Sequence, residues 1–222
     1  MDLKKHLGQY IKLEISGKKN LIGILIDIGS DIWVLFDGND YLYIPIIHIQ
    51  NWVFLKQDEI DEIFITNEPT PIYNHNEEIS LRKTLIAAKG IFTEIFVTST
   101  QSLHGYIISI MNNYFVFYSP IYKTMFISLN HLKWLIPYTN NQKPYGLSNS
   151  NLPVNPSNIT FARSFEVQIE KLIGKLIVFN IGENEKMFGK IQVIKNNFVE
   201  IIRAKEEPVF INFHHIKTVH MT

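Results

Sequence analysis

Short apolar runs separated by polar turns make up most of this chain. Near the C-terminal end they predict five strands, at residues 175–181, 186–195, 198–204, 209–213 and within 214–221. Runs of this length, rich in branched and aromatic residues and bounded by Gly, Asn or charged residues, are typical of buried strands. Gly189 lies inside the second predicted strand, where a glycine marks a bulge, a sharp bend or a close approach of two backbones. The pattern therefore predicts a small, curved antiparallel sheet.

The same pattern occurs three times along the chain. Three landmarks recur: a glycine that opens each unit, a second glycine 15 residues later, and a histidine 25 or 26 residues after that. The landmarks are Gly8, Gly23 and His48; Gly90, Gly105 and His131; and Gly174, Gly189 and His215. Around each histidine the sequence reads Ile-x-x-x-His-(Ile/Leu). Near-constant spacing at three places predicts an internal triplication.

Short helices are predicted before the second and third units. Residues 76–90 carry Asn76 as a candidate N-cap, and residues 159–174 carry Thr160 in the same role. Each stretch ends on the glycine that opens the next unit, as expected where a helix stops. Residues 1–8, before the first unit, allow one or two turns at best.

The units and their connectors give a domain order. Residues 56–75 are acidic with two prolines, and residues 139–159 are polar with three, so each predicts a linker or an ordered, extended connection. The predicted order is unit one (1–55), a connector (56–75), a helix with unit two (76–138), a linker (139–159) and a helix with unit three (160–222). A short helix followed by a bent five-stranded barrel is the outline of an Sm-like domain. The expected fold is mainly β, with three tandem Sm-like barrels.

Composition narrows the classes of function. Apolar residues make up 46% of the chain and charged residues 19%, which is enough to form a core. Basic and acidic residues balance at 21 each, whereas nucleic-acid binders usually carry a basic excess that releases counterions from phosphates. There is no cysteine, which excludes disulfides, thiolate metal sites and cysteine nucleophiles. No apolar stretch is long enough for a signal peptide or a membrane helix, so we expect a protein made in a cytoplasm and no membrane partner.

The adjacent His214 and His215 invite a metal-site interpretation. Neighbouring residues of a strand point to opposite faces, so these two side chains cannot easily share one ion. The position of His215 is a histidine in every unit, whereas Ile47 and Asn130 stand where unit three has His214. The repeated histidine is therefore predicted to be structural and to bond a neighbouring backbone group. We expect no metal, cofactor or catalytic residue, and His220 is predicted to be a tail residue.

Sm-like domains are known for RNA binding, and an Sm-like RNA-binding regulator is the alternative function. The Sm signature combines Asp-x-φ-x-Asn in one turn with Arg-Gly in another. The second place here reads "IPIIHI", "ISLNHL" and "INFHHI", without Arg-Gly. Trp33, Trp52 and Trp134 could stack on bases, but packing is favoured because Trp52 and Trp134 both follow the repeated histidine closely.

The segments "LIGKLIVFN", "KMFGKIQVI" and "FINFHHIKTV" resemble the repeated unit of the spore coat protein B family of endospore-forming bacilli. The resemblance covers nearly all of the chain. It implies a structural, non-enzymatic protein of the outer spore coat, made in the mother-cell cytoplasm, with other coat proteins as partners. Two features depart from that family. This chain lacks the long Ser/Lys/Arg-rich C-terminal tail that is phosphorylated there, and the Gly-Gly-Pro-Glu turn is missing.

Open sheets of this kind predict how such a protein assembles. Unpaired strand edges add strands from neighbours, so consecutive units are expected to pair edge to edge. The ends of the array would then bind other coat proteins or a second copy, and a dimer could close a ring of six units. Pro45, in the fourth predicted strand of unit one, lacks a backbone donor and is expected to blunt one edge.

Overall fold

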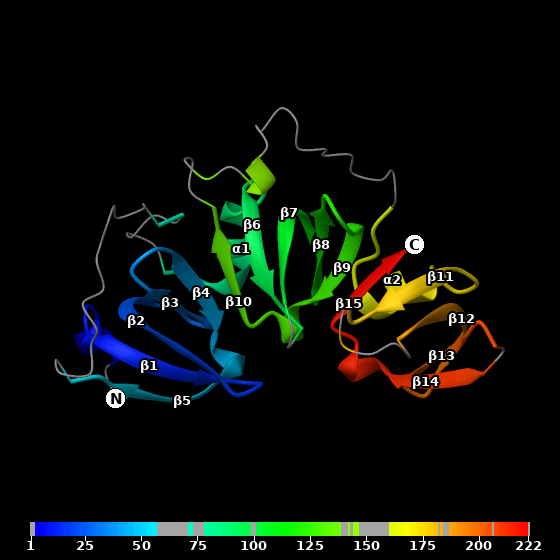
Figure 1. The fold of residues 1–222 in the computed structure, drawn as a ribbon, viewed down its shortest axis with the longest axis horizontal. Helices are drawn as coiled ribbons and strands as arrows, with labels where there is room; N and C mark the ends of the chain where they lie inside the picture. The colour runs from blue at the N-terminus through cyan, green and yellow to red at the C-terminus, as the bar shows by residue number, and fades with distance from the viewer. Residues whose placement is uncertain are drawn as a thin grey trace. The chain divides into compact units, whose positions relative to one another are not determined.

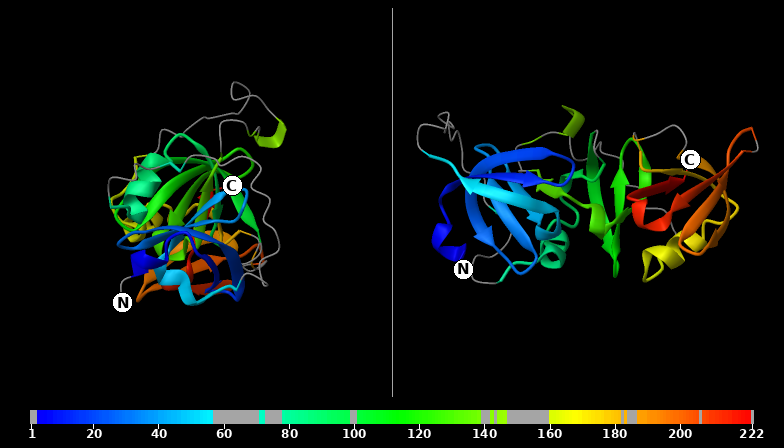
Figure 2. Two further views of the ribbon diagram at one scale, coloured as in Figure 1. Left: turned by 90° about the vertical axis from the view of Figure 1, so that its left-hand side faces the viewer. Right: turned by 90° about the horizontal axis from the view of Figure 1, so that it is seen from below.

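The computed structural model describes residues 3–56, 71–72, 78–98, 101–138, 142, 144–146, 160–181, 183, 187–205 and 207–221. The described chain is mainly β, with antiparallel strands and a few short helices (Figure 1; Figure 2). None of its described helices has the length and apolar character needed to cross a membrane. The chain divides into two compact units, Met1–Ile95 with Lys133–Gln142, and Phe96–Leu132 with Lys143–Thr222.

Most strands of the first unit come from the first third of the chain. They are β1 (Tyr10–Ile15), β2 (Lys19–Ile28), β3 (Ile32–Phe36), β4 (Tyr41–Pro45) and β5 (Ile49–Phe54), joined by β6 (Phe92–Phe96) and β10 (Trp134–Pro137). In the sheet they follow the order β6-β10-β4-β3-β2-β1-β5. Among the described residues, the helices of this unit are the 3-10 helices η1 (Leu3–His6) and η2 (Ile46–His48) and the α-helix α1 (Leu81–Ala87).

The second unit combines strands from the middle of the chain with strands from its last third. Its strands are β7 (Ser102–Ile110), β8 (Tyr114–Ser119), β9 (Lys123–Ser128), β11 (Leu176–Phe179), β12 (Phe188–Lys195), β13 (Phe198–Ile202), β14 (Pro208–Asn212) and β15 (Thr218–Met221). They follow the order β14-β13-β12-β11-β15-β9-β8-β7. The helices found in the described part of this unit are η4 (Leu129–His131), η5 (Pro144–Gly146), α2 (Phe165–Glu170) and η7 (Phe213–His215).

We call β1–β5 repeat one, β6–β10 repeat two and β11–β15 repeat three. In repeats one and three the fifth strand pairs with the first, and the remaining strands follow as consecutive hairpins. The fourth strand does not return to the fifth strand of its own repeat in the described pairings, so the sheet stays open. The prediction of a mainly β fold is confirmed, and that of three Sm-like barrels stays a prediction.

The second strand of every repeat bends at the same place. A Cβ on its glycine would lie only 2.1–2.6 Å from a carbonyl oxygen of the third strand, a distance that no real side chain tolerates. The pairs are Gly23 with Phe36, Gly105 with Tyr118 and Gly189 with Ile202. The pairing register then shifts at Leu25/Asp27, Ile107/Ser109 and Ile191/Val193, which marks a bulge. Glycine and bulge together let the second strand curve around the core.

The two α-helices begin later than the sequence predicted. Ser80 caps α1 by accepting a hydrogen bond from the Lys83 amide, and Ser164 caps α2 in the same way from Val167. The N-cap predictions of Asn76 and Thr160 are therefore wrong; Asn76 itself lies outside the described residues. In each case a serine directly before the first helical turn places its hydroxyl on an otherwise unbonded amide, which decides the start of the helix.

The opening glycine of each repeat lies between the helix that precedes the repeat and the first strand. Gly8, Gly90 and Gly174 have φ angles of +84°, +80° and +83°, a region that glycine enters at no steric cost. The Gly8 amide donates to the Leu25 carbonyl and the Gly174 amide to the equivalent Ile191 carbonyl, both at 2.8 Å. The turn thus ties the end of the helix to the bent second strand.

Candidate assembly interface

Two strand pairings link one repeat to the next, and both have the same register. In joint one, β4 of repeat one pairs with β10 of repeat two, with Tyr43 opposite Leu135. In joint two, β9 of repeat two pairs with β15 of repeat three, with Phe126 opposite Val219. In each case the first residue lies five positions before the repeated histidine of its repeat (48 − 43 and 131 − 126), and the second lies four after its own (135 − 131 and 219 − 215). The histidine spacing seen in the sequence therefore also sets how the repeats join.

The opposed side chains of both joints are buried from solvent. Tyr43, Leu135, Phe126 and Val219 each have 0% of their surface exposed. A strand added to the edge supplies backbone hydrogen bonds, and its side chains cover the aromatic ring of the strand that it joins. Burying an aromatic side chain fully is worth roughly 1.5–3 kcal/mol relative to leaving it in water, so this contact stabilises each joint substantially.

The helix that precedes a repeat forms a second part of each joint. Asp31, just before β3, accepts a hydrogen bond from the Leu81 amide of α1 at 2.7 Å. Asn113, just before β8, accepts one from the Phe165 amide of α2 at 2.8 Å. The residue before the third strand of one repeat thus fixes the first helical residue of the next. This hydrogen bond satisfies an amide of the first helical turn, which has no acceptor within the helix.

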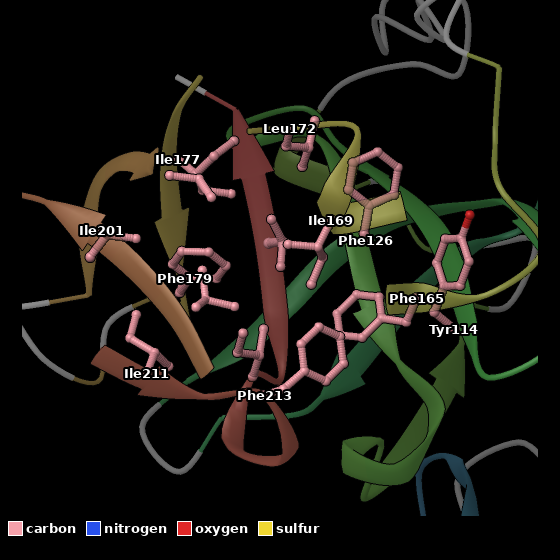
Figure 3. Close-up of a cluster of buried hydrophobic side chains, with 14 of the residues drawn as sticks. Tyr114, Phe126, Phe165, Ile169, Leu172, Ile177, Phe179, Ile201, Ile211 and Phe213 are labelled. Carbon is pink, nitrogen blue, oxygen red and sulfur yellow. The ribbon is translucent and has the colours of Figure 1, made fainter. Parts of the chain in front are cut away.

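Joint two shows how the helix covers the neighbouring repeat (Figure 3). The rings of Tyr114 and Phe165 lie 5.6 Å apart, and Phe165 also contacts Phe213, with ring centroids 5.7 Å apart. The Tyr114 hydroxyl donates to the Ala162 carbonyl at 2.6 Å, and burial raises the pKa of this tyrosine to about 12. The apolar side of α2 therefore packs against two repeats within one core cluster.

The three repeated histidines occupy one place in the fold but have different surroundings. Each ends the 3-10 turn between the fourth and fifth strands. His48 is buried with its Nδ1 2.8 Å from the Ser16 hydroxyl, whereas His215 is exposed. The His131 Nε2 donates to the His214 carbonyl, a backbone group of the next repeat, at 2.9 Å. Burial lowers the pKa of His131, which favours this neutral form.

The repeated histidines are divided between the two compact units: His48 belongs to the first, and His131 and His215 belong to the second. Within the described ranges, no three His, Cys, Asp or Glu side chains gather closely enough to hold a metal ion. His220 is not the tail residue that the sequence predicted. It lies half-buried in β15 opposite Met125, as part of joint two.

Comparison with known proteins places the chain in a family. Residues 164–219 match the family described as YwrJ third domain. A protein of Bacillus subtilis (strain 168) named uncharacterized protein YwrJ is 42% identical over 221 residues, which cover 99% of this chain and 98% of that protein. The chain belongs to the YwrJ family. The YwrJ third domain runs from the cap of α2 into β15, so it corresponds to repeat three with its preceding helix. Membership of the spore coat protein B family stays a prediction.

The outer strands of this YwrJ-family sheet carry exposed apolar side chains. β5 and β14 stand at the ends of the strand order. On β14, Phe210 is 62% exposed, although it occupies the position of Tyr43 and Phe126 in the other repeats. On β5, Val53 is 53% and Phe54 40% exposed. The aromatic position that the joints bury on the fourth strand is thus open to solvent at β14, and apolar side chains are also exposed on β5 at the other end of the strand order.

The sequence misplaced the role of Pro45. We expected it to blunt a free edge, but β4 is covered by β10, and the edge strands are β5 and β14. At the equivalent place in joint two, the Ser128 amide donates to the Lys217 carbonyl at 3.0 Å. A proline cannot donate, so the effect of Pro45 is to remove this hydrogen bond from joint one.

Sequence reasoning did not find the residues that build the joints, although their signal was present. The position five before each repeated histidine is aromatic in all three repeats, and the residue before each third strand is Asp or Asn. The members are Tyr43, Phe126 and Phe210, and Asp31, Asn113 and Asn197. Both patterns would have indicated a surface shared by successive repeats. The RNA-binding alternative stays a prediction.

Proposed function

We propose that this YwrJ-family protein is a structural component of the bacterial spore outer coat, made in the mother cell and assembled through strand-edge contacts. The observation that carries the proposal is the repeated joint. Two edge pairings in one register bury the same aromatic position, and the same edges recur at both ends of the strand order. A chain built this way is suited to adding further subunits by the contacts that hold it together.

The proposal extends to the fold of each repeat. A short helix, five strands and a bent, bulged second strand support the prediction that each repeat is an Sm-like barrel left open at one side. Such a barrel presents one fourth-strand edge and one fifth-strand edge. Repeats can then be joined in series, each using its fourth strand for the next repeat.

The recurring polar side chains support a structural role. Asp31 and Asn113 hold helix amides, and His131 holds a backbone carbonyl across joint two. His131, which the sequence singled out, and Asp31 and Asn113, which it did not, are thus all engaged in contacts that hold the fold together. The proposal accordingly assigns no catalytic residue, metal or cofactor to this chain, and expects other coat proteins among its partners.

Localisation during sporulation tests this proposal. A fluorescent fusion of the full chain, expressed in a sporulating bacillus, is expected to form a shell around the forespore. The fluorescent protein alone, made from the same promoter, is the control and should stay diffuse in the mother cell. A fusion that also stays diffuse, or that is made only in vegetative cells, would overturn the coat assignment.

A binding titration addresses the RNA alternative separately. Purified protein mixed with labelled U-rich and A-rich RNA at low salt is expected to leave the RNA unbound at micromolar protein. Saturable binding that weakens with added salt would instead favour a nucleic-acid function, since phosphate contacts carry that salt dependence.

A further inference from the structure

We propose that β14 of one copy of this protein pairs with β5 of a second copy, in the register of the two internal joints. This inference rests on the proposed function and deepens it, because it names a second copy of the chain as the partner that covers β14 and β5. It concerns a contact between purified chains, so it can be tested without a spore.

The register follows from the repeated histidines. Counting five positions before His215 gives Phe210, and counting four after His48 gives Trp52. Phe210 should therefore lie opposite Trp52 in the joint between copies. The neighbouring positions then place Val209 opposite Val53, as Met125 lies opposite His220 in joint two.

Burial of equivalent side chains shows what the missing strand would cover. The aromatic position of the fourth strand is fully buried as Tyr43 and Phe126, but Phe210 is 62% exposed. Phe198 of β13 is 44% exposed, whereas Ile32 and Tyr114, at the same place in the other repeats, are fully buried. Because Tyr114 packs on Phe165 of the helix that follows its repeat, Phe198 marks the place of a following helix rather than of a strand. An open aromatic face on a strand that elsewhere receives a partner is the mark of a docking surface.

The β5 edge offers an apolar surface to match. The Trp52 and Phe54 rings lie 4.9 Å apart, and His6 of η1 packs on Phe54 with ring centroids 4.6 Å apart. In the expected register this aromatic group comes against the Phe210 side of β14. Aromatic pairs across a strand joint add to the stability that backbone hydrogen bonds provide.

The backbone of β14 is already shaped for the joint. Ser128, whose amide donates across joint two, has φ −65° and ψ 128°. Asn212 stands at the equivalent place with φ −65° and ψ 127°, and it has an amide to donate, unlike Pro45. Its expected acceptor is the carbonyl of Gln50 in the second copy. A strand that needs no rearrangement loses little freedom on binding.

A second copy is the occupant because one chain carries both halves of the contact. One end of the strand order is a fourth strand and the other is a fifth, and these are the two kinds of strand that pair in joints one and two. The formal net charge is zero, so copies do not repel one another strongly. Head-to-tail pairing of this kind closes into a ring or extends as a chain.

The first test compares single substitutions at exposed positions. The wild-type chain should associate with rising concentration in size-exclusion chromatography with light scattering. Phe210→Lys on β14 and Val53→Lys on β5 should each weaken this association by about tenfold or more, because a charge must then be buried in the joint. Leu176→Lys is the matched control, since Leu176 is 61% exposed on β11, a strand covered on both sides, and should associate like the wild type. Circular dichroism establishes that all three variants fold.

Mixing the two edge variants tests the direction of pairing. The Val53→Lys chain keeps a normal β14, and the Phe210→Lys chain keeps a normal β5. Neither should associate alone, but an equimolar mixture should form a one-to-one complex. Pairing of β14 with β14, or of β5 with β5, would give no such rescue and would overturn the proposal.

Paired cysteines test the register, which the absence of native cysteine makes simple. A chain with Val53→Cys and Val209→Cys should form dimers or longer species linked by disulfides under mild oxidation, because opposed antiparallel residues lie within bridging distance. Val53→Cys with Pro208→Cys is the control, because a one-residue shift turns a side chain to the other face. A strictly monomeric wild type at high concentration, or equal crosslinking of both pairs, would contradict the proposed joint.

Discussion

β9 and β14 are the same strand of two successive repeats, and they differ in what lies beside them. Both follow a hairpin from the third strand and lead into a 3-10 turn that ends at a histidine. On β9, Phe126 is fully buried under β15, whereas on β14, Phe210 is 62% exposed. The difference teaches that the repeat does not complete its own core. Its fourth strand is covered by the fifth strand of the next repeat, and the helix that precedes that repeat packs beside it.

The largest effect is expected from removing the aromatic ring on the covered strand. Phe126→Ala should destabilise the protein by about 3–5 kcal/mol, because a buried cavity remains beside α2 and β15. Phe210→Ala should change stability by no more than about 0.5 kcal/mol at low protein concentration, because its ring is mostly in water. Urea unfolding followed by circular dichroism measures both. Equal losses would contradict the assignment of an open edge.

Substitutions at the bend of the second strand should cause losses of stability that differ less between repeats, because all three repeats have this bend. Gly105→Ala should destabilise the protein by about 1–3 kcal/mol, since its Cβ would lie 2.1 Å from the Tyr118 carbonyl oxygen. Gly189→Ala should cost less, because the distance is 2.6 Å and the third strand beside it borders the open β14. The same unfolding measurement ranks the two. A neutral Gly105→Ala would mean that the second strand does not approach β8 closely.

A smaller effect isolates one hydrogen bond of joint two. Ser128→Pro should destabilise the protein by about 1 kcal/mol, because it deletes the amide that donates to Lys217 while the φ of −65° already suits proline. Ser128→Ala keeps that amide and is the control for loss of the hydroxyl. If both variants had the same stability, the Ser128–Lys217 bond would not contribute to the joint.

The smallest effect is a pH dependence of joint two. Burial lowers the pKa of both His131 and His220 below the ordinary value of 6.5. The folded chain then binds fewer protons than the unfolded chain in the window below pH 6.5, so stability present above that pH falls as the pH drops through the window. The neighbouring Lys217 and His215 lower the pKa of His131 further, whereas its bond to the His214 carbonyl and the nearby Glu183 raise it, so burial decides the direction.

Substitution of both histidines measures this contribution. The His131→Gln, His220→Gln variant should lose less stability than the wild type between pH 7.5 and pH 5.5, as followed by urea unfolding at each pH. His104, which lies on β7 outside the joint, provides the control as His104→Gln and should leave the dependence unchanged. Parallel curves for the double variant and the wild type would remove these histidines from the acid response.

Local patterns in the sequence predicted the elements of the fold well. The glycine of each second strand, the turns and the period of apolar residues all act on residues close in sequence, and they indicated five strands per unit. The repeated histidines also mark the register of the joints, although the sequence alone did not reveal that meaning. Helix starts were misplaced because a nearby serine competes with any other polar residue for the cap.

Partners distant in sequence were harder to foresee. Nothing near Pro45 says that β10, some ninety residues away, covers its strand, so its role was assigned to the wrong edge. His220 was taken for a tail residue for the same reason, because its burial depends on β9 of another repeat. Strand pairing is set by which edges remain open after each hairpin forms, and that is a property of the whole chain.

Hydrogen–deuterium exchange at two protein concentrations tests the account most directly. Amides of β9 and β10 should be protected equally at low and high concentration, because joints one and two lie within one chain. Amides of β14 and β5 should exchange faster at low concentration and become protected at high concentration, as a second copy covers them. Protection of β14 and β5 that is the same at both concentrations, or a β9 that exchanges as fast as β14, would contradict it.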